Sequence, residues 1–145
     1  MSSKKSSMIT LRSQRSAFSL IELMVVIVII GMLAGLVTVS VRSYLINAKQ
    51  NVAKVDISKL TQSVDTFYTA FNRFPTNEEG LEVLTKKSEK FVEGIIPKLK
   101  NDPWGHPYEY VVPGRNGPFD IICYGADHRE GGSGADSDIR SDELE

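Results

Sequence analysis

The sequence predicts an α+β fold, in which one long N-terminal helix packs on a small C-terminal antiparallel sheet with a short second helix. Neither Gly nor Pro occurs from Leu36 to Arg73, and apolar residues recur there at steps of three to five, as in an amphipathic helix. Two apolar segments of strand length follow in residues 108–124, separated by turn residues. The 145 residues therefore suffice for one modest domain attached to a long helix.

The first 17 residues form a basic leader without an acidic residue. Its basic residues are Lys4, Lys5, Arg12 and Arg15. The stretch from Asp127 to Glu145 has the opposite sign, with seven acidic residues against two arginines. Because the formal net charge is -1, the chain lacks the overall basic character of a nucleic-acid-binding protein, and no nucleic-acid partner is expected. Cys123 is the only cysteine, which excludes an intrachain disulfide.

An apolar run in residues 18–41 is long enough to cross a bilayer as a helix. Glu22 is its only charged residue, and roughly 20 apolar residues suffice for a membrane span. The basic leader favours a cytoplasmic amino terminus. Two alternatives fit less well. A domain this small could not bury the run as a core helix, and a secretory signal peptide would need a small-x-small cleavage site before a polar boundary, which the sequence lacks.

After Val41 the apolar residues become periodic, which predicts that the helix continues with one buried face. These residues are Tyr44, Leu45, Ala48, Val52, Val55, Leu60, Val64, Phe67, Tyr68 and Phe71. The simplest interpretation is one uninterrupted helix from about Phe18 to Asn72. Its first half would lie in lipid, and one stripe of its second half would pack against the small domain.

The rest of the chain predicts a short helix and two strands. Pro75 disfavours helix in the residue before it, and Thr76 with Glu79 forms a capping-box pattern that predicts a second helix through about Lys87. Residues 88–106 contain turn pairs such as Asp-Pro and Trp-Gly, which predict irregular chain. The segments YEYVV and PFDIICY, separated by PGRNG, predict two antiparallel strands.

The Gly-rich stretch GADHREGGSGADSDI, residues 125–139, is a candidate metal loop. Asp127, Asp136 and Asp138 offer three carboxylates within twelve residues. Calcium takes six to eight oxygens from carboxylates and backbone carbonyls, which Gly-rich loops can turn inward. The EF-hand pattern is absent, so from composition alone a solvated acidic loop is as consistent as a calcium site.

No motif for catalysis is apparent. The sequence contains no phosphate-binding glycine loop, nucleophile elbow or paired-carboxylate motif. His106 and His128 lie among turn residues and share no metal-ligand spacing with Cys123, which ends an apolar strand and is expected to pack as a small hydrophobe. We therefore expect a structural protein and no enzyme.

The stretch AFSLIELMVVIVIIGMLAGL, residues 17–36, resembles the cleavage junction and helical spine of the type IV pilin superfamily. The segments RFPTNEEGLEVL, DPWGHPYEYVVPGRNGPFDI and YGADHREGGSGADSDI are similar to one branch of it, the major pseudopilins of bacterial type II secretion systems. They occur in that family's order, and the resemblance extends from Phe18 to Ile139. It implies a pilin-like fold and a subunit that polymerises into a filament, which drives folded proteins across the outer membrane.

The resemblance also implies how the chain is processed. Residues 1–17 would be a cleaved leader, 18–41 a transmembrane and assembly helix in the inner membrane, and 42–145 a periplasmic domain. Prepilin peptidase would cut between Ala17 and Phe18 and methylate the new amine of Phe18. Glu22 is fifth after that cut, and a carboxylate near hydrocarbon persists when it has a cation or a functional role. The Phe18 amine of a neighbouring copy would supply the cation in a homo-oligomeric filament.

The same resemblance implies partners and a bound metal. Minor pseudopilins and the inner-membrane secretion platform would be partners. Calcium would bind in the Gly-rich loop through Asp127, Asp136 and Asp138 and through carbonyls near Tyr124 and Ser133. Two alternatives remain, a type IV pilus subunit used in adhesion or motility and a monomeric membrane-anchored calcium-binding domain. The acidic loop, the missing cysteine pair and the short domain favour the pseudopilin.

Overall fold

The computed structural model describes residues 18–144, except for the side chains of residues 37–40. The predicted leader, with Ala17 of the predicted cleavage site, and Glu145 lie outside the described residues. The chain divides after Val39 into two compact units.

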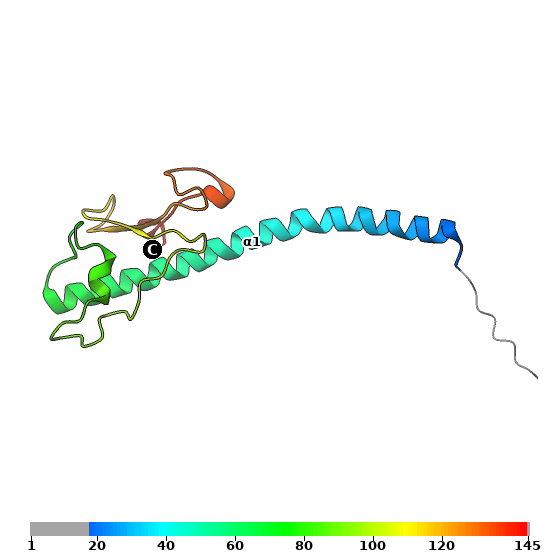
Figure 1. Cartoon of the computed structure of the whole chain (residues 1–145). Coiled ribbons are helices and arrows are strands. Elements are labelled where there is room, and N and C mark those ends of the chain that lie inside the picture. The colour runs from blue at the N-terminus through cyan, green and yellow to red at the C-terminus, as the bar shows by residue number, and fades with distance from the viewer. Residues whose placement is uncertain (1–17, 145) are drawn as a thin grey trace, which may run out of the picture. The chain divides into compact units, whose positions relative to one another are not determined.

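The first unit contains the N-terminal part of α1, an α-helix from Leu20 to Phe71 (Figure 1). Its large apolar side chains from Leu20 to Leu36 are exposed, and that of Ile27, for example, is 65% exposed. Among the described residues, α1 is the one helix that is long and apolar enough to cross a membrane. Because water disfavours so large an apolar surface, this part of α1 needs lipid or other subunits around it.

The second unit begins at Ser40 and is built on one buried stripe of α1. The stripe residues recur at steps of four and three and are at most 8% exposed; they are Ala53, Ile57, Leu60, Val64 and Phe67. They form one core with residues of the C-terminal segments, including Leu84, Tyr110 and Ile121. The uninterrupted helix is confirmed, and it ends where Asn72 adopts a φ of 52°. The predicted buried face is only partly right, because Leu60, Val64 and Phe67 are buried whereas Tyr44, Leu45, Val52, Val55, Tyr68 and Phe71 are exposed.

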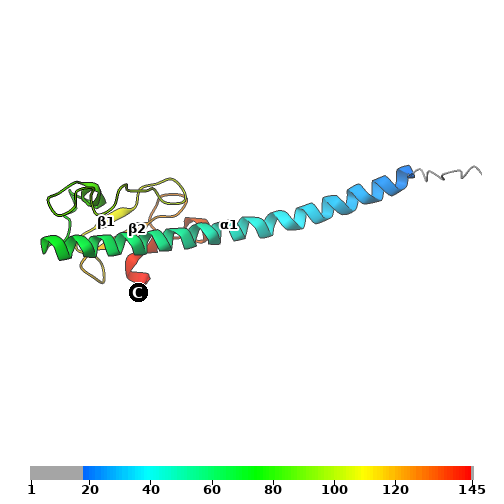
Figure 2. The ribbon, with the colours of Figure 1, turned by 90° about the horizontal axis from the view of Figure 1, so that it is seen from below.

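A three-stranded antiparallel sheet supplies the other side of this core (Figure 2). Its strands are β1 (Glu109–Val111), β2 (Asp120–Cys123) and β3 (Ile139–Arg140), in the order β1-β2-β3. Tyr110 lies opposite Ile121, and Cys123 lies opposite Ile139. The predicted pair of strands is confirmed, whereas β3 was not predicted because two residues are too short to show a period of two.

The predicted second helix is wrong in type and length. The capping box forms, since the Thr76 amide donates to Glu79 Oε2 at 3.0 Å and the Glu79 amide donates to Thr76 Oγ1 at 3.2 Å. The capping box leads into a turn and then into the five-residue 3-10 helix η1 (Leu81–Thr85). Gly80 lies between the turn and η1 with a φ of 55° and a ψ of -161°, a backbone conformation that cannot continue an α-helix.

Candidate functional site

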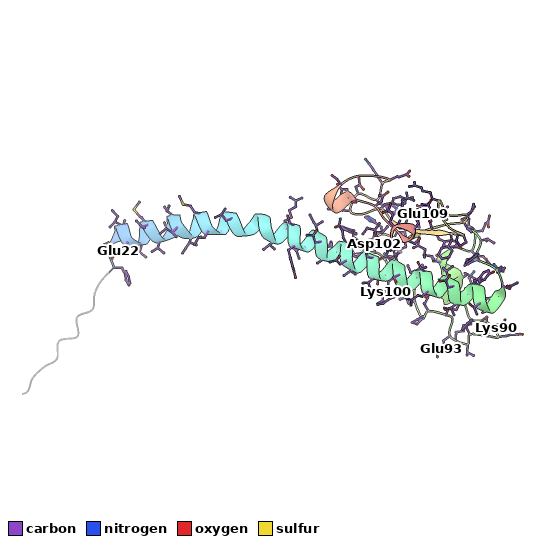
Figure 3. All side chains as sticks on the ribbon, turned by 180° about the vertical axis from the view of Figure 1, so that it is seen from behind. Glu22, Lys90, Glu93, Lys100, Asp102 and Glu109 are labelled. Atoms are coloured by element: carbon purple, nitrogen blue, oxygen red, sulfur yellow. The ribbon has the colours of Figure 1, made fainter. Side chains whose placement is uncertain are left out.

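Glu22 lies in the first turn of α1, where it forms a capping box with Ser19 (Figure 3). The Ser19 amide donates to Glu22 Oε2 at 2.7 Å, and the Glu22 amide donates to Ser19 Oγ at 3.2 Å. Each bond satisfies an amide that the start of a helix would otherwise leave open. The Ser-x-x-Glu signature in SLIE is visible in the sequence, but the capping role of Glu22 was not predicted.

An open apolar surface surrounds this turn. It is formed by the exposed side chains of Phe18, Ile21, Leu23, Val25 and Val26 next to Glu22. Phe18 is 81% exposed at the first described position of the chain. The carboxylate of Glu22 therefore lies at the rim of an apolar surface, where it can bind a cation that arrives with an apolar partner.

The Gly-rich loop begins after β2 and returns to the sheet at β3. Gly125 and Gly132 have φ angles of 66° and 93°, and a Cβ atom at either position would lie within 2.7 Å of a backbone atom of Asp136. The Ala126 amide also donates to the Ala135 carbonyl at 2.9 Å. The two limbs of the loop, residues 125–130 and 133–138, therefore pack backbone to backbone at Gly125, and Gly132 lets the bend between the limbs approach Asp136 closely.

The predicted calcium ligands lie on both limbs. Asp127 Oδ1 accepts the Arg129 amide at 3.1 Å, whereas Asp136 belongs to the single-turn 3-10 helix η2 (Gly134–Asp136). Asp138 Oδ2 accepts the Gly131 amide at 3.0 Å. Asp138 Oδ1 is buried without a hydrogen-bond partner among the described residues. An open carboxylate oxygen in a tightly curled Gly-rich loop fits a hard cation.

The sequence also predicts that backbone carbonyl oxygens near Tyr124 and Ser133 bind calcium. Ser133 has its carbonyl engaged by the Asp136 amide at 3.2 Å, and Tyr124 leads from β2 into the loop. Within residues 18–144, no group of three or more His, Cys, Asp or Glu side chains gathers as a metal site. A cation here would therefore depend on carbonyl oxygens in addition to the carboxylates.

Two contacts that were not predicted hold the loop limbs in place. His128 stacks on His106 with ring centroids 4.7 Å apart, which ties the first limb to the turn before β1. Gln50 Nε2 of α1 donates to the Gly134 carbonyl on the second limb at 2.6 Å. The sequence carries no local signal for either contact, because the partners lie 22 and 84 residues apart.

The segment NDPWGHP folds around the buried carboxylate of Asp102 (Figure 3). Asp102 Oδ1 accepts the amides of Trp104 and His106 at 2.9 and 2.8 Å, and Cys123 Sγ donates to Oδ2 at 3.3 Å. Burial raises the pKa of the Cys123 thiol to about 12, which keeps it protonated. Cys123 is thus packed in the core, as predicted, whereas its hydrogen bond to Asp102 was not predicted, and the arrangement is structural.

Comparison with known proteins gives two family matches. Residues 40–142 match the family described as type II secretion system (T2SS), protein G. Residues 12–38 match the prokaryotic N-terminal methylation motif.

Individual relatives and a solved structure resemble the chain over most of its length. It is 44% identical to the type II secretion system core protein G of Pseudomonas aeruginosa, covering 88% of this chain and 95% of that protein. It is 37% identical to the core protein G of Vibrio cholerae, covering 87% and 90%. The crystal structure of the major pseudopilin from the type 2 secretion system of enterohaemorrhagic Escherichia coli matches with a TM-score of 0.56 at 28% identity, over 66% of this chain and 87% of that one.

Proposed function

The chain belongs to the type II secretion system protein G family and is a structural subunit of the secretion pseudopilus, not an enzyme. We propose that prepilin peptidase cuts this subunit between Ala17 and Phe18 and methylates the new amine of Phe18. The match of residues 12–38 to the N-terminal methylation motif supports this step. The cut leaves a chain that begins directly before the capping box of α1.

The first part of α1 anchors the subunit in the inner membrane, and the domain from residue 42 lies in the periplasm. The exposed apolar surface from Leu20 to Leu36 and the basic leader before it support this orientation. Minor pseudopilins and the inner-membrane platform contact the growing filament. The filament pushes folded proteins across the outer membrane.

Assembly pairs the Phe18 amine of one subunit with the Glu22 carboxylate of the next. The observation that carries this proposal is that Glu22 is the one acidic residue in the first turn of α1, where exposed apolar side chains surround it. An ion pair inside packed apolar helices is little screened by water, and either charge alone would be costly to bury. The pair therefore favours helices that are stacked in register over helices that lie alone in lipid.

Three variants separate the charge of Glu22 from its capping role. Glu22→Gln keeps a capping-box side chain but removes the charge, Glu22→Leu removes both, and Ser19→Ala weakens the cap while keeping the charge. We expect both Glu22 variants to lose filament assembly and secretion and Ser19→Ala to retain most of both. Electron microscopy of sheared filaments and a secretion assay measure this. Normal assembly of Glu22→Gln would overturn the ion pair.

Calcium binds in the Gly-rich loop through Asp127, Asp136 and Asp138, with carbonyls near Tyr124 and Ser133. Calcium would neutralise the carboxylates that these residues hold on the two limbs. The buried, open Oδ1 of Asp138 supports this assignment.

Calorimetric titration of the full chain in detergent tests the calcium site. We expect saturable heat with calcium and a higher Tm, because a ligand that binds only the folded state stabilises it. Asp138→Asn removes a charge at the open oxygen and should weaken binding strongly, whereas the exposed Glu82→Gln should not. Neither heat nor a melting shift in the unmodified chain would overturn the site.

The alternative of a type IV pilus subunit predicts a different phenotype. Deletion would then abolish adhesion or motility and leave secretion intact. If the chain were a monomeric calcium-binding anchor, it would form no filament and would not be needed for secretion. The Glu22 variants would then behave like the unmodified chain.

A further inference from the structure

Gln50 of α1 contacts a part of the chain that lies 84 residues away. Its Nε2 donates to the carbonyl oxygen of Gly134 at 2.6 Å, which joins the long helix to the second limb of the Gly-rich loop. We propose that Gln50 is the positioning residue that docks this limb on α1 in the conformation that binds a cation. The proposal rests on the calcium site proposed above, but its docking step has a readout of its own.

The contacted turn is held together by its own backbone hydrogen bonds. The Asp136 amide donates to the Ser133 carbonyl at 3.2 Å, and the Ser137 amide donates to the Gly134 carbonyl at 3.3 Å. Ala135 accepts the Ala126 amide of the first limb at 2.9 Å. Gln50 therefore donates its hydrogen bond to a turn that is already formed, and this bond holds the turn against the helix.

Docking of the turn controls where the carboxylates lie. Asp136 is part of η2, and its backbone is in close contact with Gly125 and Gly132. Asp138 lies two residues further on and presents its open Oδ1 within the loop. A turn that lifts from α1 would strain the hydrogen bond between Ala126 and Ala135 and shift Asp136 relative to Asp127 on the first limb. If only the docked loop binds a cation, the apparent affinity falls in proportion to the docked fraction.

The first limb has a separate attachment. His128 stacks on His106, and Trp104 of the same turn lies under Lys49, whose Nζ is 5.8 Å from the ring centroid. Lys49 and Gln50 are adjacent on α1, so consecutive residues of the helix contact the two limbs, one of them through the turn around Asp102. Loss of the Gln50 side chain should therefore loosen residues 131–138 and leave the first limb in place.

Hydrogen exchange of the full chain in detergent tests this inference, first without calcium. Gln50→Ala removes the side chain, and Gln50→Glu keeps its size but replaces the donating amide by a carboxylate. We expect amides of residues 131–138 to exchange about 2- to 10-fold faster in both variants, the range for one net hydrogen bond. Amides of residues 57–64 should be unchanged. Gln62→Ala is the matched control, since Gln62 lies on the same helix and lines a surface groove with Lys54 and Leu144.

Calcium titration of the same proteins gives the second readout. Gln50→Ala should raise the apparent Kd for calcium by a factor similar to its effect on exchange, whereas Gln62→Ala should not change it. Unchanged exchange in residues 131–138 of both Gln50 variants would overturn the docking role, as would faster exchange throughout residues 40–144. Absence of calcium binding by the unmodified chain would overturn the metal site and the cation-binding part of this inference. The exchange data would still decide whether Gln50 docks the loop.

Discussion

At the scale of single residues, Glu22 and Glu79 occupy the same position in two capping boxes, but only Glu79 has a cationic side chain as a partner nearby. Glu79 binds the Thr76 amide at 3.0 Å and the Arg73 guanidinium at 2.6 Å. Glu22 binds the Ser19 amide in the same way, yet the sequence from Phe18 to Val41 contains neither Lys nor Arg. No side chain of this segment can supply a cation for Glu22, so the candidates are terminal amines created by the cut before Phe18, and the proposal assigns the pairing amine to a neighbouring subunit.

Glu79 gives a prediction for the pH dependence of stability. The Arg73 guanidinium and the Thr76 amide lower the pKa of Glu79 from 4.5 to about 2. Because the folded pKa lies below the unfolded one, ionised Glu79 stabilises the fold above about pH 4.5, and this contribution is lost as the pH falls toward 2. We expect Glu79→Gln to lower the Tm at pH 7 and to approach the unmodified chain near pH 2, as measured by scanning calorimetry.

The control for this experiment is Glu82→Gln, which changes a nearby exposed carboxylate. It should show little difference from the unmodified chain at any pH. A Tm difference for Glu79→Gln that stays constant from pH 7 to 2 would contradict the role of its charge.

At the scale of elements, the second unit's part of α1 presents two apolar stripes. One is buried in the core and includes Ile57 and Val64, both of which have 0% exposure. The other is exposed and includes Leu45, Val52 and Val55, each more than 50% exposed. Burial of the first stripe stabilises the second unit, whereas the second stripe contributes little to the stability of the isolated subunit.

Two matched truncations test this assignment of the stripes. Ile57→Ala removes methyl groups from a fully buried site and should lower the free energy of unfolding by about 2–5 kcal/mol. Val55→Ala, two residues earlier on an exposed face, should change it by less than about 0.5 kcal/mol. Denaturant unfolding of the full chain in detergent, followed by near-UV circular dichroism, measures both. Equal effects of the two substitutions would contradict the assignment.

The elements also explain which features could be predicted from the sequence. The long helix was predictable because its periodicity extends over many turns, and the strands β1 and β2 were predictable from apolar runs bounded by turn residues. The second helix was wrongly predicted because a capping box is a local signal for a helix start, whereas the backbone conformation of Gly80 ends the turn before an α-helix can form. Strand β3 and the contact between Gln50 and Gly134 depend on distant partners, which no local pattern encodes.

At the scale of the whole molecule, the subunit combines a helix that needs apolar neighbours with a small domain that has its own core. In the proposed filament, the first part of α1 would find those neighbours in other subunits, and the Glu22 charge would fix their register. The Gly-rich loop, docked on α1 by Gln50, would stabilise the domain that each subunit carries. The central claim is that the Glu22 carboxylate meets the amine of another subunit.

Chemical cross-linking of mixed filaments tests that claim most directly. Filaments assembled from equal amounts of ¹⁴N- and ¹⁵N-labelled subunits are treated with an apolar carbodiimide, which joins a carboxylate to an adjacent amine without a spacer. Peptides are then analysed by mass spectrometry, with filaments that receive no carbodiimide as the control. We expect a peptide that links the Phe18 amine to Glu22 and contains one labelled and one unlabelled partner in about half of the cases. Intact filaments in which Glu22 forms no such link, or links only within one subunit, would contradict that claim.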